Sequence, residues 1–305
     1  MNSGIEKKLD ELKGDNISGA SEIVMKAIEL VEKSLEYIDF QKTNIKDELY
    51  DLFKKIIALR PSMAPLINCM GFLVNNITKF SKMEIKHTIN KLREKRISQQ
   101  KKLESNFQVF FKENYRPQMK IMITSYSSTL IKTILKLKIK NMIFYVLESR
   151  PLLEGYKTSA KLAENYETHL IIDAAMGKFI SQIDLILLGI DSLLKDGSII
   201  NKIGTYPLSV MGYETNKKVI ALGDSFKYNL QNHFGKEIKI ERKPSNEITE
   251  TIKQKDNIIV ENYYFDLTPS KYITKIISDL GIHTPVESVK EIKSKIPIEW
   301  FKNYL

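Results

Sequence analysis

The stretch of sequence that decides the fold is residues 184–206, which read DLILLGIDSLLKDGSIINKIGTY. An apolar run, Leu185–Leu188, ends in a glycine, and the carboxylate Asp191 follows at once. Asn201 and Lys202 come ten residues later. In open α/β sheets, a buried strand that delivers an acid and then a polar, glycine-containing loop at its carboxyl end builds small-molecule sites. The stretch therefore predicts a Rossmann-like sheet with a binding site beside Asp191.

The composition predicts a globular protein. With 305 residues, the chain can form one large domain or two of ordinary size. Hydrophobic residues make up 43% and charged residues 28%, which favours a packed core over general disorder. Cys69 is the one cysteine, so no disulfide can form within the chain, which fits a reducing setting. The first residues lack a signal-peptide core, and no apolar run approaches the roughly 20 residues of a membrane helix. We therefore expect a cytoplasmic protein with no membrane association.

The formal net charge of +10 is open to several interpretations. A basic surface could bind nucleic acid, an acidic protein or phosphorylated metabolites. Lysine is abundant along the whole chain, however, so a generally solvated basic surface is the simpler interpretation. Glutamates interrupt the basic segment 82–112, and few aromatic residues lie within it, which favours a solvated helix over an RNA-binding face. We therefore do not expect direct nucleic-acid binding.

The spacing of apolar residues divides the chain into two parts. Helical spacing predicts helices over 18–37, 44–59, 64–77 and 82–112. After Pro117, short apolar runs alternate with helical stretches, which predicts βαβ units and a mostly parallel sheet. The predicted strands are Lys120–Thr124, Met142–Leu147, His169–Ile172, Leu185–Leu188, Val219–Leu222 and Ile258–Val260, and the helices between them are 127–138, 156–165, 174–182 and 205–215. The fold class is therefore α/β, with a helical N-terminal domain at 1–116 and a Rossmann-like domain at 117–305.

The C-terminal part carries one further helix prediction. A turn at Thr268–Ser270 precedes an apolar stretch that ends at Leu280. Gly281 then occupies the position where a glycine commonly follows the end of a helix. We therefore expect a helix that ends at Leu280.

The first predicted strand leads into a turn lined with hydroxyls. Ser125-Tyr126-Ser127-Ser128 stands where a glycine-rich dinucleotide loop would lie, and the chain has no Walker P-loop. The N-terminus of a helix can still hold a phosphate through its backbone N–H groups and its dipole. Ser127 and Ser128 are therefore candidate phosphate ligands. In the alternative interpretation, one of these serines only caps the helix.

Two arginines are candidate anion ligands. Arg150 stands at the end of a predicted strand before a proline, which suits bidentate binding of a phosphate or carboxylate. Alternatively, Arg150 pairs locally with Glu148 or Glu154. Arg60 ends a predicted helix and could point toward a cleft between the domains, although an arginine there also suits the helix dipole.

Two aspartates follow predicted strands. Asp173 begins a predicted helix, and we expect it to be an ordinary N-cap. Asp191 lies just past a strand end, where a carboxyl group in a partly desolvated cleft can act as a general acid or base. Because Asn201 and Lys202 follow it, we expect a polar pocket that accepts anions.

The sequence predicts neither a metal site nor a bound cofactor. The histidines at 87, 169, 233 and 283 share no ligand spacing, and Cys69 has no cysteine companion. Cys69 lies in an apolar helix, so we expect it to be inert core packing.

A set of motifs points to a known family. They are Arg60-Pro61-Ser62, Glu148–Gly155, Asp173–Ala175, Gly189–Ser192, Gly197–Thr205, Ser225–Tyr228, Phe265–Pro269 and Asp279–Pro285. Together they resemble the alpha, beta and delta regulatory subunits of translation initiation factor 2B. The same superfamily holds the archaeal ribose-1,5-bisphosphate isomerases and the methylthioribose-1-phosphate isomerases. The resemblance covers nearly the whole chain and is strongest from 120 to 285.

The resemblance implies a fold and a ligand. It implies a helical N-terminal domain on a Rossmann-like domain, a homodimer formed through the latter, and a sugar-phosphate pocket between the domains. It also implies that the binding residues Arg60, Arg150, Asn201 and Lys202 are present. In the isomerases, an aspartate and a cysteine transfer the proton. The aspartate position corresponds to Asp191.

The cysteine position of the isomerases holds Ser125 in this chain. A serine hydroxyl is a far weaker acid than a thiol, whose pKa is about 8.5, so it is a poor proton shuttle without a strong base beside it. Thr124 stands in place of the preceding histidine. The resemblance therefore implies a non-catalytic, alpha-type regulatory protein that contacts translation initiation factor 2, through its alpha subunit, and responds to a sugar phosphate or a nucleotide. The alternative is an aldose–ketose isomerase that uses Asp191, which is the isomerase-like residue at its position.

Overall fold

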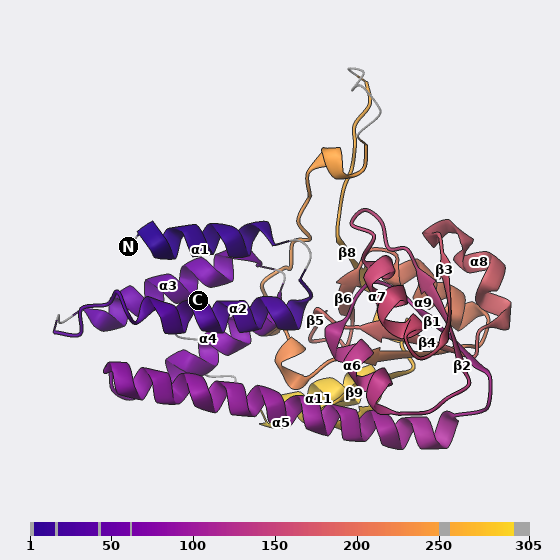
Figure 1. The fold of residues 1–305 in the computed structure, drawn as a ribbon, viewed down its shortest axis with the longest axis horizontal. Coiled ribbons are helices and arrows are strands. Elements are labelled where there is room, and N and C mark those ends of the chain that lie inside the picture. The colour runs from indigo at the N-terminus through magenta and orange to yellow at the C-terminus, as the bar shows by residue number, and fades with distance from the viewer. Residues whose placement is uncertain (1–2, 16–17, 42–43, 62, 250–256, 296–305) are drawn as a thin grey trace.

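The computed structural model describes residues 3–15, 18–41, 44–61, 63–249 and 257–295. A group of N-terminal helices lies beside an α/β part that contains a seven-stranded sheet and a smaller three-stranded sheet (Figure 1). The predicted fold class is therefore confirmed. The expected boundary between residues 116 and 117 falls between the last N-terminal helix and the first strand.

The N-terminal part consists of helices that pack apolar side chains into a common core. They are α1 (Ser3–Gly14), α2 (Ala20–Ser34), α3 (Ile45–Leu59), α4 (Ala64–Asn76) and α5 (Lys82–Asn114). The sequence predicted all of them except α1. Its three buried apolar residues, Ile5, Leu9 and Leu12, have helical spacing but are separated by charged residues that hide the pattern.

Helix α5 belongs to both parts of the molecule. Near its start, Ile85 and Ile89 pack into the core of the N-terminal helices. Toward its end, Leu103, Phe107 and Phe111 pack into the core on one face of the sheet. The long, charged helix therefore contributes to both hydrophobic cores and is more than a solvated connection between them.

The large sheet has a topological switch point at its centre. Its strands are β1 (Met119–Ile123), β2 (Met142–Leu147), β3 (Glu167–Ile171), β4 (Leu185–Gly189), β7 (Lys218–Leu222), β9 (Lys275–Ser278) and β10 (Gly281–His283). Their order is β10-β9-β7-β4-β1-β2-β3, and only the β9–β10 pair is antiparallel. The chain proceeds from β1 toward β3 on one side and from β4 toward β9 on the other. In open α/β sheets, ligands bind beyond the carboxyl ends of the strands at such a point.

Helices cover both faces of this sheet. Alternate residues of a strand point to opposite faces, and β4 shows this clearly. Leu185 and Leu187 share a core with α5, α6 (Ser128–Lys136) and α7 (Glu154–Ala163). Ile186 and Leu188 share the other core with α9 (Thr205–Glu214).

The smaller sheet contains residues that we expected in a loop. It pairs β5 (Ser192–Leu193), β6 (Ile199–Lys202) and β8 (Phe265–Thr268) in antiparallel fashion. Asn201 and Lys202 thus lie at the end of a buried strand, and the polar loop begins only after them. Gly204, with φ of 96°, makes the turn into α9.

Three element predictions were wrong. The stretch that ends at Leu280 is not a helix, because its β-branched residues Ile276 and Ile277 form β9 beside β7. Ile258–Val260 is not a strand; it lies on an arm that extends from the molecule, where Ile259 is 77% exposed (Figure 1). The helix expected at 174–182 is broken into η1 (Asp173–Ala175), α8 (Met176–Phe179) and η2 (Ile180–Gln182).

The remaining elements are short, apart from the helix at the C-terminal end of the described chain. They are η3 (Ser225–Lys227), α10 (Leu230–His233), η4 (Ser245–Glu247), η5 (Ser270–Tyr272) and α11 (Pro285–Lys295). Element η4 lies on the arm.

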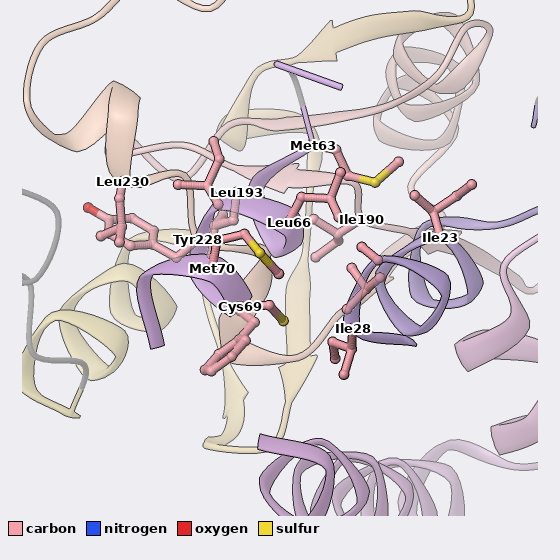
Figure 2. Close-up of a cluster of buried hydrophobic side chains, with 14 of the residues drawn as sticks. Ile23, Ile28, Met63, Leu66, Cys69, Met70, Ile190, Leu193, Tyr228 and Leu230 are labelled. Atoms are coloured by element: carbon pink, nitrogen blue, oxygen red, sulfur yellow. The ribbon is translucent and has the colours of Figure 1, made fainter. Parts of the chain in front are cut away.

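One apolar cluster joins the N-terminal helices to the carboxyl edge of the sheet (Figure 2). Its labelled members are Ile23, Ile28, Met63, Leu66, Cys69, Met70, Ile190, Leu193, Tyr228 and Leu230. Ile190 directly precedes Asp191 in the chain. This packing therefore fixes the end of β4, and with it Asp191, relative to α2 and α4.

Candidate functional site

Two neighbouring cavities lie at the switch point. The first, which we call the arginine chamber, has a volume of about 80 Å³ and is lined by Arg60, Ser125, Glu154, Asp191 and Lys202, with Asp15, Ser18–Ala20, Ile23, Met63, Tyr126, Leu152, Tyr264 and Phe265. The second, the serine chamber, has a volume of about 30 Å³ and is lined by Ser125, Ser127, Ser128, Asp191, Asn201 and Lys227, with Ala20, Ser21, Thr124, Tyr126, Thr129, Gly189, Ile190 and Leu222. Residues after β1, after β4 and from α2 thus meet in one place.

A larger groove lies elsewhere and holds none of the candidate residues. Its volume is about 620 Å³, and it is lined by residues 118, 135 and 138–143 together with 165–167. These residues stand at the amino ends of β1, β2 and β3. Because parallel sheets bind ligands at the carboxyl ends of their strands, the smaller chambers are the better candidate site.

Ser125 occupies a constrained backbone position. Its φ is 65°, in the left-handed region that a residue other than glycine rarely adopts. Its N–H donates to Ser149 Oγ at 2.7 Å, and its carbonyl accepts from Thr158 Oγ1 at 2.7 Å. The turn after β1 is therefore held by the loop after β2 and by α7, and Ser125 lines both chambers.

The start of α6 forms one wall of the serine chamber. Ser127 is the N-cap of the helix, because its Oγ accepts a hydrogen bond from the N–H of Leu130 at 3.3 Å. Ser128 is buried in the first turn. Gly189 faces this turn, and a Cβ at that position would lie 3.1 Å from Ser127 Cβ and 3.4 Å from Asn201 Oδ1. The glycine after the apolar run thus allows β4, β6 and α6 to converge.

Asp191 and Lys227 form an ion pair in the lining of the serine chamber, and Asp191 also lines the arginine chamber. Lys227 Nζ lies 3.8 Å from Asp191 Oδ1, and the two side chains are 7% and 21% exposed. Burial raises the pKa of Asp191, and the positive charges of Lys227 and Lys202 limit that rise. Burial likewise lowers the pKa of Lys227, and Asp191 opposes the fall. A carboxyl group with a raised pKa in a cleft can act as a general acid or base.

Sequence reasoning did not select Lys227 as a site residue. Its motif, Ser225–Tyr228, was noticed only as part of the resemblance. The signal in the sequence is that Lys227 follows a predicted strand, β7. Because β7 is parallel to β4, the carboxyl ends of both strands lie at the same edge of the sheet. The buried lysine that follows β7 therefore completes the charge arrangement around Asp191.

The N-terminal helices hold the turn that carries Lys227. Arg96 of α5 donates to Asp224 at 2.6 Å, and both side chains are nearly buried. Burial alone would raise the pKa of Asp224, but Arg96 and Lys227 hold it below its usual value. Asn68 of α4 donates to two backbone carbonyls of the same turn. The site thus depends on both parts of the molecule.

The arginine chamber is lined by two basic residues, Arg60 and Lys202, and by three acidic residues, of which Asp15 forms an ion pair with Lys26 outside the lining. Lys202 Nζ lies 2.8 Å from Glu154 Oε1, and it stands 5.2 Å from the centroid of the Tyr264 ring. Arg60 lines the chamber and donates to the carbonyl of Asp15 at 2.8 Å. The third carboxylate belongs to Asp191. Ser62, from the same motif as Arg60, lies outside the described residues.

Arg150 lies away from both chambers. Its guanidinium is exposed and donates to the carbonyl of Ile248 on the arm at 3.1 Å. Glu154, one of the local partners considered for it, pairs with Lys202 instead. The structure therefore brings Arg60, Ser125, Ser127, Ser128, Asp191, Asn201 and Lys202 together and leaves Arg150 outside the group.

Asp173 is not the N-cap that we expected. Ile172 occupies that position, and the Asp173 carboxylate accepts hydrogen bonds from the N–H groups of Ser149 and Arg150, both at 2.8 Å. Asp173 therefore holds the loop after β2, which is a tertiary role that local sequence does not reveal.

Asp266 supports the turn that carries Asn201 and Lys202. Its carboxylate accepts from the N–H of Gly204 at 2.7 Å and from the N–H of Tyr206 at 3.1 Å, at the start of α9. Burial raises its pKa to about 6 in spite of these hydrogen bonds. In the same turn, Asn201 Nδ2 donates to Thr205 Oγ1 at 3.0 Å. The candidate ligands on β6 are therefore fixed by their own neighbours.

Cys69 lines neither chamber. It is fully buried in α4, and burial raises the pKa of its thiol to about 12. It is therefore in no position to replace the thiol that Ser125 lacks. Among the described residues, no cluster of three or more histidine, cysteine or acidic side chains could hold a metal ion. The helices in the described part of the chain are too short or too polar to cross a membrane.

The chain is similar to proteins of one family over most of its length. The sequence model of the initiation factor 2 subunit family matches residues 16–285. A putative translation initiation factor eIF-2B subunit 2-like protein from Pyrococcus furiosus is 30% identical over 286 residues, which cover 92% of this chain and 96% of that protein. A ribose 1,5-bisphosphate isomerase from Methanocaldococcus jannaschii is 25% identical over 286 residues, with 92% of each chain covered.

A solved structure has the same fold. The Pyrococcus horikoshii translation initiation factor eIF-2B superposes with a TM-score of 0.82 at 24% identity, covering 95% of this chain and 100% of that one. The relatives therefore include both factor-like proteins and an isomerase.

Proposed function

Because the chain belongs to the initiation factor 2 subunit family, we propose that it is a non-catalytic, alpha-type regulatory protein. In this proposal it contacts translation initiation factor 2, through the alpha subunit of that factor, and responds to a sugar phosphate or a nucleotide. It acts as a homodimer formed through the C-terminal part. The observation that carries the proposal is that Ser125 and Asp191 line the same two chambers at the switch point, where proton transfer in the isomerases would need a thiol.

The lining of the chambers supports the binding of an anionic ligand. Ser127, Ser128 and Asn201 offer polar atoms in the serine chamber, and Lys227 supplies a buried positive charge. The start of α6 adds a helix dipole oriented favourably for a phosphate. Lys202 and Arg60 offer two further cations in the arginine chamber. Arg150 could take part only after its guanidinium leaves the Ile248 carbonyl.

A pull-down with translation initiation factor 2, and with its isolated alpha subunit, tests the partner. We expect binding at micromolar concentration. Because the chain has a net charge of +10, the experiment is repeated at about 0.5 M salt, where attraction between exposed charges is largely screened. Absence of binding in every nucleotide state of the factor would contradict the proposed partner.

The second candidate function is a sugar-phosphate isomerase that uses Asp191. The observation in its favour is the raised pKa of this carboxyl group beside the buried ammonium of Lys227, an arrangement suited to moving a proton. Similarity to the Methanocaldococcus jannaschii ribose 1,5-bisphosphate isomerase also favours it. We place it second because Ser125 stands at the position of the isomerase cysteine and no histidine lines either chamber.

A further inference from the structure

The turn that carries Lys227 is held by a carboxylate that lines neither chamber. Asp279 accepts from the N–H of Ser225 at 2.6 Å through Oδ1, and from Ser225 Oγ at 3.0 Å through Oδ2. Ser225 Oγ in turn accepts from Gln99 Nε2 of α5 at 2.8 Å, and both of these side chains are buried. Ser225 stands two residues before Lys227, so these contacts fix the backbone from which the lysine extends.

The paired strands of the large sheet bring Asp279 to this turn. Strands β7 and β9 are parallel neighbours, and the N–H of Gly223 donates to the Ile277 carbonyl at 3.2 Å just past the end of β7. Asp279 begins the short turn from β9 to β10. Gly281 completes it with φ of 136°, where a Cβ would lie 2.5 Å from His283 Nε2. The carboxylate is therefore presented by a strand pair and not by a long loop.

The ammonium of Lys227 depends on its backbone for its position. Its stem passes over Gly223, because a Cβ at that glycine would lie 3.1 Å from Lys227 Cγ. Lys227 Nζ lies 3.8 Å from Asp191 Oδ1, which is longer than a hydrogen bond. Contact with Asp191 is therefore too loose to place the ammonium, and the turn must do so.

The charges around Asp279 explain why its contact with Ser225 is strong. Asp224 begins the same turn, accepts from the N–H of Phe226 at 3.0 Å and pairs with Arg96. Burial and the negative charge of Asp224 raise the pKa of Asp279, and its hydrogen bonds from Ser225 oppose that rise. A desolvated carboxylate is costly unless donors satisfy it, so Ser225 and Asp279 stabilise each other's position.

We propose that Asp279 is a positioning residue, which acts through Ser225 to hold the ammonium of Lys227 beside Asp191 and in the wall of the serine chamber. The inference rests on the proposed binding of a phosphorylated ligand, to which Lys227 would present its charge. Because attraction between charges falls with distance, a side chain outside both chambers thereby sets how strongly the ligand is held.

The pKa of Asp191, followed by NMR of its carboxyl carbon, is the first test of Asp279→Ala in the full chain. The charges that lower the pKa of Asp191 are those of Lys227 and Lys202. If Lys227 moves away, the pKa of Asp191 should rise above its value in the unaltered chain. Direct loss of the negative charge at position 279 would act in the opposite direction, so a rise isolates the position of Lys227.

The affinity for ribose 5-phosphate, measured by calorimetric titration, is the second test. It should fall roughly threefold to tenfold in Asp279→Ala, because part of one charge-assisted contact is lost. Asp279→Asn keeps an acceptor for the Ser225 N–H, so it should change both quantities in the same direction but less.

Asp184→Ala is the matched control. Asp184 also accepts from a backbone N–H, that of Lys120 at 2.9 Å, but it directly precedes β4 and so lies at the opposite edge of the sheet. This variant should keep the pKa of Asp191 and the affinity of the unaltered chain.

An unchanged pKa of Asp191 in folded Asp279→Ala overturns the inference, and Asp279→Asn decides in the same way if the alanine variant does not fold. An equal change in Asp184→Ala also overturns it. If the unaltered chain binds no ribose 5-phosphate, the proposed ligand class is overturned, while the pKa of Asp191 still decides the role of Asp279.

Discussion

Ser125 and Asp191 are the single residues on which the proposal of binding without conversion rests. Both line the two chambers, and both are held by backbone hydrogen bonds. Burial raises the pKa of the Asp191 carboxyl group above its ordinary value. A serine hydroxyl needs an adjacent base before it can give up its proton. We therefore keep binding without proton transfer as the proposed function of these chambers.

Asp266 gives a prediction about pH at the same scale. Its pKa of about 6 lies above the usual value of 3.8, so the folded protein holds this proton more tightly than the unfolded chain does. Its contribution to stability is therefore fully present below about pH 4 and is lost as the pH rises through about 6, by at most about 3 kcal/mol. Asp266→Asn should lack this slope while keeping one acceptor for the α9 turn.

Urea unfolding of the unaltered chain and of Asp266→Asn at pH 4.5 and 7 measures the difference. The comparison between the two proteins removes the contribution of other titrating groups. The same pH dependence in both proteins would show that Asp266 does not titrate in this range.

Helix α7 illustrates at the scale of elements how a local contact positions the site. Its second residue, Gly155, touches the end of β2, so Gly155→Ala should lower the free energy of unfolding by about 1–3 kcal/mol or more. Gly14→Ala is the control, because a Cβ at the end of α1 would meet no atom within 4 Å. It should be neutral or slightly stabilising. Equal effects of the two substitutions in denaturant unfolding would contradict this packing.

The elements also show what the sequence could reveal. Strand β4 was evident because a buried parallel strand is a continuous apolar run that ends in glycine. Strand β9 was mistaken for a helix because a short apolar run fits the spacing of a helix as well as that of a strand. Its pairing with β7 is what makes it a strand. Strand β6 was missed because its last residues, Asn201 and Lys202, are polar yet buried. The local sequence pattern thus identified a strand that is buried and apolar, and it missed a strand whose buried end is polar.

Parts of the site depended on information that the sequence does not display. Asp191 and the serines after β1 could be placed because they directly follow strands at the switch point. Glu154 and Asp173 could not be assigned, because each has a partner that lies far from it in the sequence, Lys202 on β6 and Ser149 after β2. Arg150 contacts the arm instead of the chambers, through a contact that spans nearly a hundred residues.

At the scale of the whole molecule, the buried ion pair of Arg96 and Asp224 links the long N-terminal helix α5 to the α/β part. Arg96 lies on the helix shared by both cores, and Asp224 opens the turn that carries Lys227. Arg96→Ala leaves a buried carboxylate without its main counter-charge, so the free energy of unfolding should fall by about 3–5 kcal/mol. Lys91→Ala, at an exposed position of the same helix, should change it by less than about 0.5 kcal/mol.

Chemical denaturation followed by circular dichroism measures both variants. The Arg96→Ala variant should also bind ribose 5-phosphate more weakly, because the turn that carries Lys227 loses its support. A variant that is as stable as the unaltered chain would contradict the idea that this pair joins the two parts.

The central claim is that the molecule binds a phosphorylated ligand without converting it. The most direct test is to incubate the full chain with ribose 1,5-bisphosphate and to follow the sugar by NMR, with Asp191→Asn measured in parallel. We expect no conversion by either protein, while the ligand is bound. Conversion by the unaltered chain that Asp191→Asn abolishes would contradict the account and establish the isomerase in its place.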